Sequence, residues 1–328
     1  MENGNTFNAI KTRTGVIYFD KIRKLEWLSV GDYGKEKNLK ADFLELKNRI
    51  EGVAHKDVSL SDKWVITVST QKGCQCFCDF CDVPKVGFHG NCTIDDFEFM
   101  LSEALRREHC HKTARLNIHF ARMGEPSFNP DVIPFVRDHL DDIVNNYIEA
   151  DTIHPVISTM MPIANPKLYR FLLDWCQLKK ERNGEAGLQL SIQSTDETQR
   201  HEQFFGCAMP LKQISRLADK LPPPMGRKYT LNFAVTEKTI LDAKVLTSLF
   251  DKENWLVKIT PIHETKAARE NGFDVTSAYE KYDVYQKFEE PLLADGWDVI
   301  VFVPSKEEDE DRITCGNALL SDFKRVRQ

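Results

Sequence analysis

The sequence predicts an α/β fold in the form of an incomplete or open (β/α) barrel. From Trp64 onward, short apolar runs rich in β-branched residues alternate with spacers of helix length. This alternation is typical of repeated βα units that build a parallel sheet. The chain has 328 residues, of which 41% are hydrophobic and 29% charged, so it can bury the core of one large α/β domain or of two smaller ones.

About six βα units and a final strand are expected, fewer than in a closed eight-unit barrel. The predicted strands cover residues 64–69, 115–120, 152–158, 188–193, 229–235, 255–259 and 297–303. The predicted helices cover residues 94–108, 132–143, 167–178, 211–221, 240–250 and 275–294. Because parallel α/β folds bind ligands at the carboxyl ends of their strands, functional residues are expected just after each strand.

Three parts are expected along the chain. Residues 1–63 are polar and mixed, with a strand-like patch at Val16–Phe19 and a helix-like run near Ala41–Ile50, and are predicted to form an N-terminal accessory segment. Residues 64–305 are predicted to form the barrel. Residues 306–328 are predicted to form a C-terminal segment that carries Cys315.

Charge and cysteine content narrow the function classes. The net charge is −6, whereas proteins that hold nucleic acid mainly through phosphates are usually basic. No run reaches the ~18 apolar residues of a membrane span, and the first residues lack a signal-peptide core. We therefore expect a cytoplasmic protein without membrane contact, whose nine cysteines are ligands, reactive thiols or core residues.

Four cysteines, Cys74, Cys76, Cys78 and Cys81, follow the first barrel strand in GCQCFCDFC. A structural zinc site would need a second Cys or His pair, for which only 109–111 is a candidate. A redox pair of Cys78 and Cys81 is a second interpretation. The favoured one takes Cys74, Cys78 and Cys81 as three ligands of a [4Fe–4S] cluster whose fourth iron stays open, with Cys76 as a spectator.

This C-x3-C-x2-C spacing, with Phe80 before the last cysteine, resembles the radical S-adenosylmethionine (SAM) superfamily. The resemblance implies a partial (β/α)6 barrel of the radical SAM type, here with a short N-terminal extension. It implies that SAM chelates the open iron and that an electron from the cluster cleaves SAM to a 5′-deoxyadenosyl radical, which abstracts a hydrogen atom. It also implies a flavodoxin-like or ferredoxin-like reductase as electron donor.

Further segments are similar to the RlmN/Cfr family, whose members methylate carbon-2 or carbon-8 of adenine in RNA. The similar segments run in order from VSTQKGCQCFCDFC through GFHGN, MGEP, VIST and LQLSIQS to RITCGNAL. The resemblance implies an RNA or nucleotide substrate and gives a methyl-carrying role to Cys315 and a catalytic, proton-accepting role to Glu51. It implies SAM contacts at Gly124, Glu125, Ser158, Ser191, Gln193 and His263.

The chemistry of these residue types agrees with the resemblance. Gly124 allows a ligand to approach the backbone closely, and the carboxylate of Glu125 can accept hydrogen bonds from an ammonium group. The small hydroxyl side chains of Ser158 and Ser191 can bond a carboxylate or ribose without filling the pocket.

Four features depart from the family pattern. The family's second catalytic cysteine, which resolves the protein–RNA adduct through a disulfide, is replaced by Thr67. A histidine after the fourth strand is replaced by Gln193, and an asparagine after the sixth by His263, although both side chains can still bond a cofactor. The region before the cluster motif is also shorter. In addition, the acidic run Glu307–Asp311 is expected to raise the pKa of the Cys315 thiol unless the loop folds away.

The sequence thus predicts a methyltransferase-like radical SAM enzyme. The main alternative keeps the radical but acts on a nucleotide, peptide or other small substrate without methylation of Cys315, and Thr67 favours it. The alternative from another class is a zinc-stabilised, nucleic-acid-binding protein without catalysis.

Overall fold

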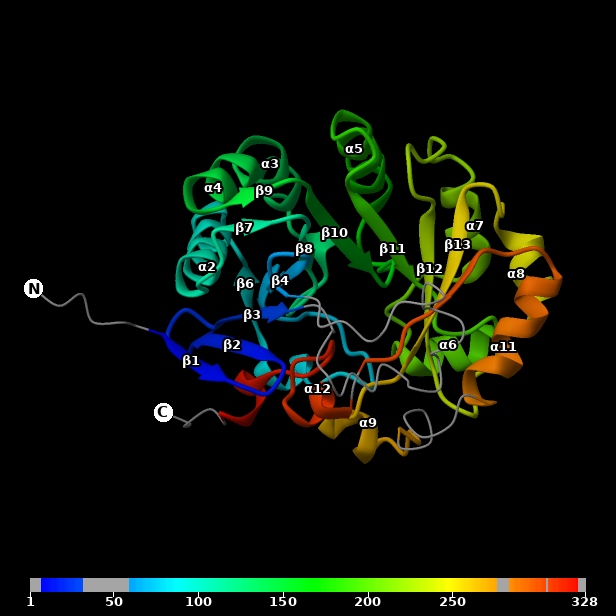
Figure 1. Ribbon diagram of the computed structural model, residues 1–328. Helices are drawn as coiled ribbons and strands as arrows, with labels where there is room; N and C mark the ends of the chain where they lie inside the picture. The colour runs from blue at the N-terminus through cyan, green and yellow to red at the C-terminus, as the bar shows by residue number, and fades with distance from the viewer. Residues whose placement is uncertain (1–6, 32–58, 276–282, 305, 324–328) are drawn as a thin grey trace, which may run out of the picture.

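The computed structural model describes residues 7–31, 59–275, 283–304 and 306–323. Glu51 and the helix-like run at 41–50 lie outside these residues. One large sheet dominates the described chain, curved into an arc with the longer helices along its outer side (Figure 1). This is the α/β partial barrel that the sequence predicts.

The arc is formed by seven parallel strands, extended at one edge by three antiparallel N-terminal strands. The parallel strands, in spatial order, are β4 (Trp64–Val68), β8 (Leu116–Phe120), β10 (Ile153–Thr159), β11 (Gly187–Ser191), β12 (Tyr229–Val235), β13 (Trp255–Pro261) and β14 (Val299–Val301). The N-terminal strands are β1 (Asn8–Lys11), β2 (Gly15–Asp20) and β3 (Leu25–Gly31), and β3 pairs with β4. Each predicted barrel strand is therefore present.

Helices connect the parallel strands. They are α2 (Ile94–Arg107), α3 (Val132–Asp138), α4 (Leu140–Tyr147), α5 (Leu168–Glu181), α6 (Glu197–Gln203), α7 (Leu211–Ala218), α8 (Ala243–Leu249), α9 (Lys266–Glu270) and α11 (Asp283–Ala294), and α12 (Lys306–Glu310) follows the last strand. The predicted helix at 132–143 is two helices, because the backbone at His139 leaves the helical region. The helix predicted from 240 begins at Ala243, because the Asp242 carboxylate caps it by accepting from the amides of Lys244 and Val245.

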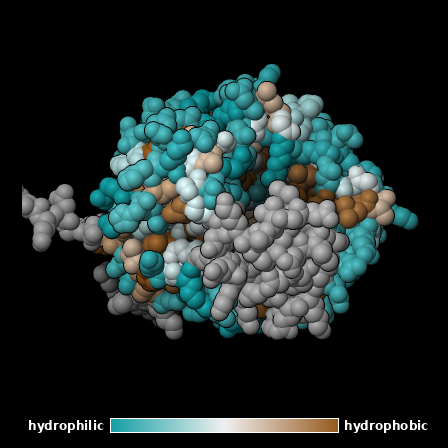
Figure 2. Space-filling view, in the orientation of Figure 1, coloured by the Kyte–Doolittle hydropathy of each residue, from teal (hydrophilic) through white to brown (hydrophobic). Residues whose placement is uncertain are grey.

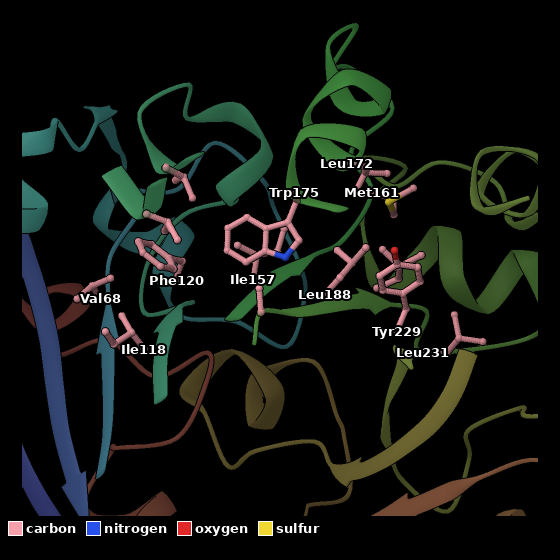
Figure 3. Close-up of a cluster of buried hydrophobic side chains, with 14 of the residues drawn as sticks. Val68, Ile118, Phe120, Ile157, Met161, Leu172, Trp175, Leu188, Tyr229 and Leu231 are labelled. Carbon is pink, nitrogen blue, oxygen red and sulfur yellow. The ribbon is translucent and has the colours of Figure 1, made fainter. Parts of the chain in front are cut away.

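The core lies between the outer face of the sheet and the helices (Figure 3). Ile118, Phe120, Ile157, Leu188 and Leu231 are fully or almost fully buried there. Because side chains alternate along a strand, the residues between them face the inside of the arc. These inward residues are mostly polar and partly exposed, and they include Asn117, His119, Ser158, Gln189, Asn232 and Lys258.

A small hairpin of β5 (Gln71–Gly73) and β6 (Phe88–Asn91) flanks the cysteine loop. Gly73 has a φ of +84°, and a Cβ there would lie 1.5 Å from the carbonyl oxygen of Gly87. The hairpin therefore requires glycine at this position.

The C-terminal segment packs against the N-terminal strands, so the two ends of the described chain lie side by side (Figure 1). Arg13 forms ion pairs with Asp311 and Glu310, each at 2.9 Å, and the ring of Phe323 stacks on Phe19. The outer rim of the face shown in Figure 2 is largely hydrophilic. Among the described residues, no helix combines the length and apolar character that crossing a membrane requires.

Candidate active site

Cys74, Cys78 and Cys81 lie on a tight loop between β5 and the 3-10 helix η2 (Val83–Val86), all partly exposed. The amide of Cys81 donates to the carbonyl of Cys78 at 3.2 Å, which closes the turn. The amide of Asp79 donates to the carbonyl of Gln203 at 3.0 Å, which ties the loop to α6. The loop is thus held by backbone bonds at the carboxyl end of the sheet.

The helix after β13 holds the same loop from the other side. The carboxylate of Asp82, which is fully buried, accepts hydrogen bonds from the amides of Lys266 (3.1 Å) and Ala267 (2.9 Å) in the first turn of α9. The hydroxyl of Thr265 donates to the carbonyl of Phe80 at 2.7 Å. Asp82 and α9 therefore position the last cysteine of the motif.

Cys74 packs against one apolar cluster together with Cys81 and against a second together with Cys78, so the three thiols are neighbours. Burial raises the pKa of Cys78 and of Cys81 well above the usual thiol range, and the neighbouring thiols raise it further. The pKa of Cys74 is lowered, chiefly by its hydrogen bond with the Cys76 side chain. Raised pKa values oppose the redox-pair interpretation of Cys78 and Cys81, because reactive CxxC thiols have lowered ones.

The donor set fits an iron–sulfur cube better than one zinc ion. Among the described residues, no three His, Cys, Asp or Glu side chains converge as ligands of a single ion must. In a cube each thiolate binds a separate iron, so three neighbouring thiols can surround it. Binding of a cluster would release the thiol protons of Cys78 and Cys81, and the positive charge of the iron ions would stabilise the resulting thiolates.

Glu125 lies beside this loop, just after β8, and is buried. Its carboxylate accepts from the amides of Ser127 (3.1 Å) and Met160 (2.9 Å), so it joins the ends of β8 and β10. Burial raises its pKa, and these hydrogen bonds oppose the rise. Its charge acts on Cys74 and Cys78, so it lies where a cation bound next to the loop would be stabilised.

Gly124 has a φ of +94°, and its close approach is to protein rather than to open space. A Cβ there would lie 2.5 Å from the side chain of Gln71. The Gln71 amide oxygen accepts from the amide of Glu125 at 3.1 Å. Gly124 therefore lets the turn after β8 pack on the hairpin before the cysteines.

Ser158, Ser191 and Gln193 lie at the ends of neighbouring strands, as their sequence positions predict. Ser158 and Ser191 are partly exposed on the inner face, where hydroxyls can meet a ligand. Gln193 is buried with a φ of +65°, and its side-chain oxygen accepts from the amide of Ala234 at 2.6 Å. The side-chain carbonyl of Gln193 thus ties the segment after β11 to β12.

Sequence reasoning missed Arg200 on α6, which is buried behind the strand ends. Its guanidinium donates to the carbonyls of Ser191 (2.8 Å), Ile192 and Met160 (3.2 Å), and it lies over the ring of Phe204. Burial lowers its pKa to about 10, so it remains a cation at neutral pH. Its segment, TDETQRHEQ, is polar throughout and gave no signal of burial.

His263 follows β13 and points to the C-terminal segment. Its Nδ1 lies 3.1 Å from a carboxylate oxygen of Asp309 on α12. The other oxygen of Asp309 accepts from the amide of Glu264 at 2.7 Å. The structure thus brings His263 to the edge of the site, joined to α12.

Cys315 lies in the loop after α12, next to the cysteine loop. The carbonyl of the following residue, Gly316, accepts from the amide of Asp82 at 2.8 Å and lies 3.7 Å from the sulfur of Cys81. The sulfur of Cys315 lies 3.9 Å from the carbonyl oxygen of Ala121 at the end of β8. The chain thereby brings together cysteines that are more than 230 positions apart.

The acidic run does not act on Cys315 as a nearby negative charge. Asp311 and Glu310 pair with Arg13, on the side of the N-terminal strands. Surrounding protein raises the pKa of the Cys315 thiol, whereas the positive charges of Arg122 and Lys258 lower it. The loop that carries Cys315 folds away from these carboxylates. The acidic run therefore does not raise the pKa of the Cys315 thiol as the sequence had suggested.

A buried ion pair between Arg122 and Glu26 holds this loop. Both side chains are inaccessible to solvent. Arg122 also donates to the carbonyls of Thr314 (3.1 Å) and Arg312 (3.0 Å). The Glu26 carboxylate accepts from the amides of Leu319 (3.1 Å) and Leu320 (2.9 Å). The pair therefore clamps the loop on both sides of Cys315.

Thr67 faces the inside of the arc and pairs with His119 on β8. Three other cysteines, Cys92, Cys110 and Cys176, are buried in the core under the helices, and Cys207 packs on the outer side of the cysteine loop. The chain thus offers no second cysteine beside Thr67.

These features define the class of the protein: it has the partial (β/α) barrel of radical SAM proteins, with a three-cysteine loop after the first barrel strand. A radical SAM methyltransferase from Sphaerobacter thermophilus superposes on it with a TM-score of 0.65 and 17% identity, covering 96% of this chain and 82% of the other. SuiB of Streptococcus suis, solved with S-adenosylmethionine, has a TM-score of 0.44 at 14% identity and covers 76% of this chain and 48% of its own.

The sequence is also RlmN-like over part of its length. It is 34% identical to the dual-specificity RNA methyltransferase RlmN of Aliarcobacter butzleri (strain RM4018) over 71 residues. The match spans 22% of this chain and 20% of that relative. No protein-family model matches the chain. The expected likeness to radical SAM proteins is confirmed at the level of the fold, and the expected likeness to RlmN is confirmed over this 71-residue segment.

Replacement of a single motif cysteine tests the cluster loop. Cys78→Ala should lose most of the about four irons per chain expected after anaerobic reconstitution, because a cube needs all three thiolates. Cys76→Ala should keep them, because its buried thiol is not one of the ligands. Iron and zinc are measured together by plasma emission spectrometry, and equal loss in both variants, or one zinc per chain, would contradict this ligand set.

The buried clamp should contribute strongly to stability. Glu26→Gln should lower the free energy of unfolding by about 3–5 kcal/mol, because it leaves the charge of Arg122 buried without its counterion. Asp141→Asn, which breaks an exposed pair with Arg182, should cost about 0–1 kcal/mol. Urea unfolding measures both, and similar losses in the two variants would remove the clamp's special role.

Proposed function

We propose that this chain is a radical SAM methyltransferase-like enzyme. Cys74, Cys78 and Cys81 hold one [4Fe–4S] cluster, and Cys315 carries a methyl group to the substrate. The observation that supports this most is the position of Cys315, whose neighbour Gly316 bonds the backbone of Asp82 beside the third ligand. The ion pair of Arg122 and Glu26 holds the loop on both sides of this thiol, which keeps Cys315 beside the cysteine loop.

The cluster, when bound, supplies the electron that cleaves SAM. The residues of this chain bind and orient SAM. The carboxylate of Glu125 stabilises the SAM ammonium group, and Ser158 and Ser191 present hydroxyls from neighbouring strand ends. Gln193 and His263 shape the rim of the same site, and Arg200 fixes the carbonyl of Ser191 from behind.

Cys315 acts as the nucleophile in methyl transfer. Its thiol first loses a proton to water, and the sulfur then forms a bond to the SAM methyl carbon while the carbon–sulfonium bond breaks and S-adenosylhomocysteine leaves. A second SAM, when bound beside the cluster, would supply the radical chemistry that activates this methyl group by removal of a hydrogen atom. The methyl carbon would then bond to the substrate, whose displaced proton would pass to Glu51, outside the described residues, and whose surplus electron would return to the bound cluster. An external thiol would break the remaining carbon–sulfur bond by forming a disulfide with Cys315.

The similarity to RlmN supports adenine in RNA as the substrate. A flavodoxin-like or ferredoxin-like reductase is the proposed electron donor.

A second candidate function acts on a small substrate without methylation of Cys315. Thr67 favours this candidate, because a threonine hydroxyl cannot resolve an adduct through a disulfide. RNA affinity at two salt concentrations separates the two, because phosphate contacts are strongly salt dependent.

Radical formation is tested with the reconstituted protein, SAM and dithionite under anaerobic conditions. We expect 5′-deoxyadenosine, detected by liquid chromatography and mass spectrometry, from the wild type and from Cys207→Ser. Cys78→Ala should form almost none, because it lacks a cluster ligand. An intact cluster with no 5′-deoxyadenosine would defeat the proposal.

Methyl transfer to Cys315 should accelerate as pH rises. Surrounding protein raises the pKa of this thiol, so the thiolate is a minor species at neutral pH and increases with alkalinity. Peptide mass spectrometry after incubation with SAM should show one added methyl group on Cys315, formed on the order of 50- to 100-fold faster at pH 9 than at pH 7, because below its pKa the thiolate fraction of a thiol rises tenfold per pH unit. Absence of the methyl group at both pH values would favour the second candidate.

A further inference from the structure

The inside of the barrel carries positive charge below the cysteines. Ser191, Asn232 and Lys258 are consecutive Cα partners across β11, β12 and β13, so their side chains form one inward-facing row. All three are partly exposed, whereas the residues next to them in each strand are buried under the helices. The row therefore lines the accessible inner face of the barrel.

Lys258 has no carboxylate partner among the described residues. Its ammonium group lies 4.8 Å from the ring centroid of Phe302 on the neighbouring strand end, which stabilises a cation but does not neutralise it. Burial lowers its pKa to about 8, and Arg227 and Lys63 lower it further, whereas the Cys315 thiol raises it. At neutral pH the lysine is still mostly protonated.

Two polar neighbours accompany this charge. His119 faces the same interior, and burial together with the charge of Lys258 lowers its pKa to about 3, so it is a neutral imidazole that can donate one hydrogen bond. The side-chain oxygen of Asn232 is buried and makes no hydrogen bond within the protein. That oxygen is an acceptor, so the groups here that can hold an anion are the ammonium of Lys258 and the N–H of His119.

The carboxylates around the inner face bond other partners. Glu185 pairs with Arg115 (3.1 Å) and His154 (2.7 Å). Asp298 pairs with Lys228 at 2.8 Å, at the opposite end of the barrel from the cysteines. The inward-facing row therefore presents the Lys258 cation to a ligand that enters the barrel.

We propose that Lys258 and His119 bind an anionic group, phosphate or carboxylate, on the substrate. This assignment rests on the proposed methyl transfer at Cys315, and it names a small anionic molecule in place of adenine in RNA as the substrate class of the same site. The sulfur of Cys315 lies 3.9 Å from the carbonyl oxygen of Ala121, two residues after His119, so an anion held in this interior would place the adjoining part of the substrate toward the methyl-carrying sulfur. A substrate whose anionic end inserts into the barrel is a small molecule or nucleotide, rather than an RNA that inserts a neutral base.

The rates of Cys315 alkylation report whether this site attracts anions, and they can be measured without enzymatic turnover. Iodoacetate is an anion and iodoacetamide is a neutral reagent of similar size, and both react with the thiolate. The ratio of their rates therefore cancels any change in thiol pKa and reports the local attraction of anions. In Lys258→Gln of the reconstituted protein the ratio should fall by about threefold to tenfold, as expected for loss of one partly screened charge.

Two variants and two competing anions complete the test. Lys258→Arg should keep the wild-type ratio, and so should Lys244→Gln, which removes an exposed charge on α8. At constant ionic strength, inorganic phosphate should slow the reaction of wild-type Cys315 with iodoacetate but not with iodoacetamide. Acetate tested in the same way separates a carboxylate site from a phosphate site. These wild-type measurements stand even if a variant fails to fold.

An unchanged ratio in a folded Lys258→Gln, or competition by neither anion, would overturn the proposal. Equilibrium dialysis with SAM gives a further check, because a large loss of SAM affinity with an unchanged ratio would assign Lys258 to the cofactor. Failure to form 5′-deoxyadenosine would remove the proposed radical function and leave the alkylation ratio untouched. The two proposals therefore fail separately.

Discussion

The site depends on one buried ion pair, between Arg122 and Glu26. Taking two charges out of water costs several kcal/mol per ion, and such a pair persists only where additional hydrogen bonds satisfy both groups. Here they are satisfied by two carbonyls and two amides of the Cys315 loop. The pair joins β3, the end of β8 and the C-terminal segment. Its geometry thus makes the position of Cys315 a consequence of the barrel and the N-terminal strands together.

The two faces of the barrel sheet differ in polarity. Its outer face is apolar and packs under the helices, which contributes most of the burial that stabilises the fold (Figure 3). Its inner face has serine, asparagine, histidine and lysine side chains at alternate positions. A closed barrel of this size would fill its interior with apolar side chains. An open one can leave it polar, because water and ligands satisfy those groups.

The strands could be predicted because β-branched runs such as those in β4 and β13 bury one or both faces, a local property that the sequence shows directly. The three-cysteine loop could be predicted because its spacing is also local. Arg200 and Glu26 could not, because a charged residue in a polar segment looks like solvated surface until distant carbonyls and amides enclose it. For the same reason the effect of the acidic run on Cys315 depended on how the loop folds, which only the tertiary structure determines.

The departure at Thr67 and the charge inside the barrel have a common implication. Thr67 pairs with His119, and His119 lies within the field of Lys258, so the position without a second cysteine is part of the same polar interior. A site that forms a protein–substrate adduct and resolves it by a disulfide needs two thiols facing each other, and this interior offers one. A site that holds its substrate through an anionic group needs a cation inside the barrel, and Lys258 lies in the inward-facing row. The polar interior is therefore consistent with the proposed anion site, and it lacks the pair of thiols that resolving an adduct through a disulfide requires.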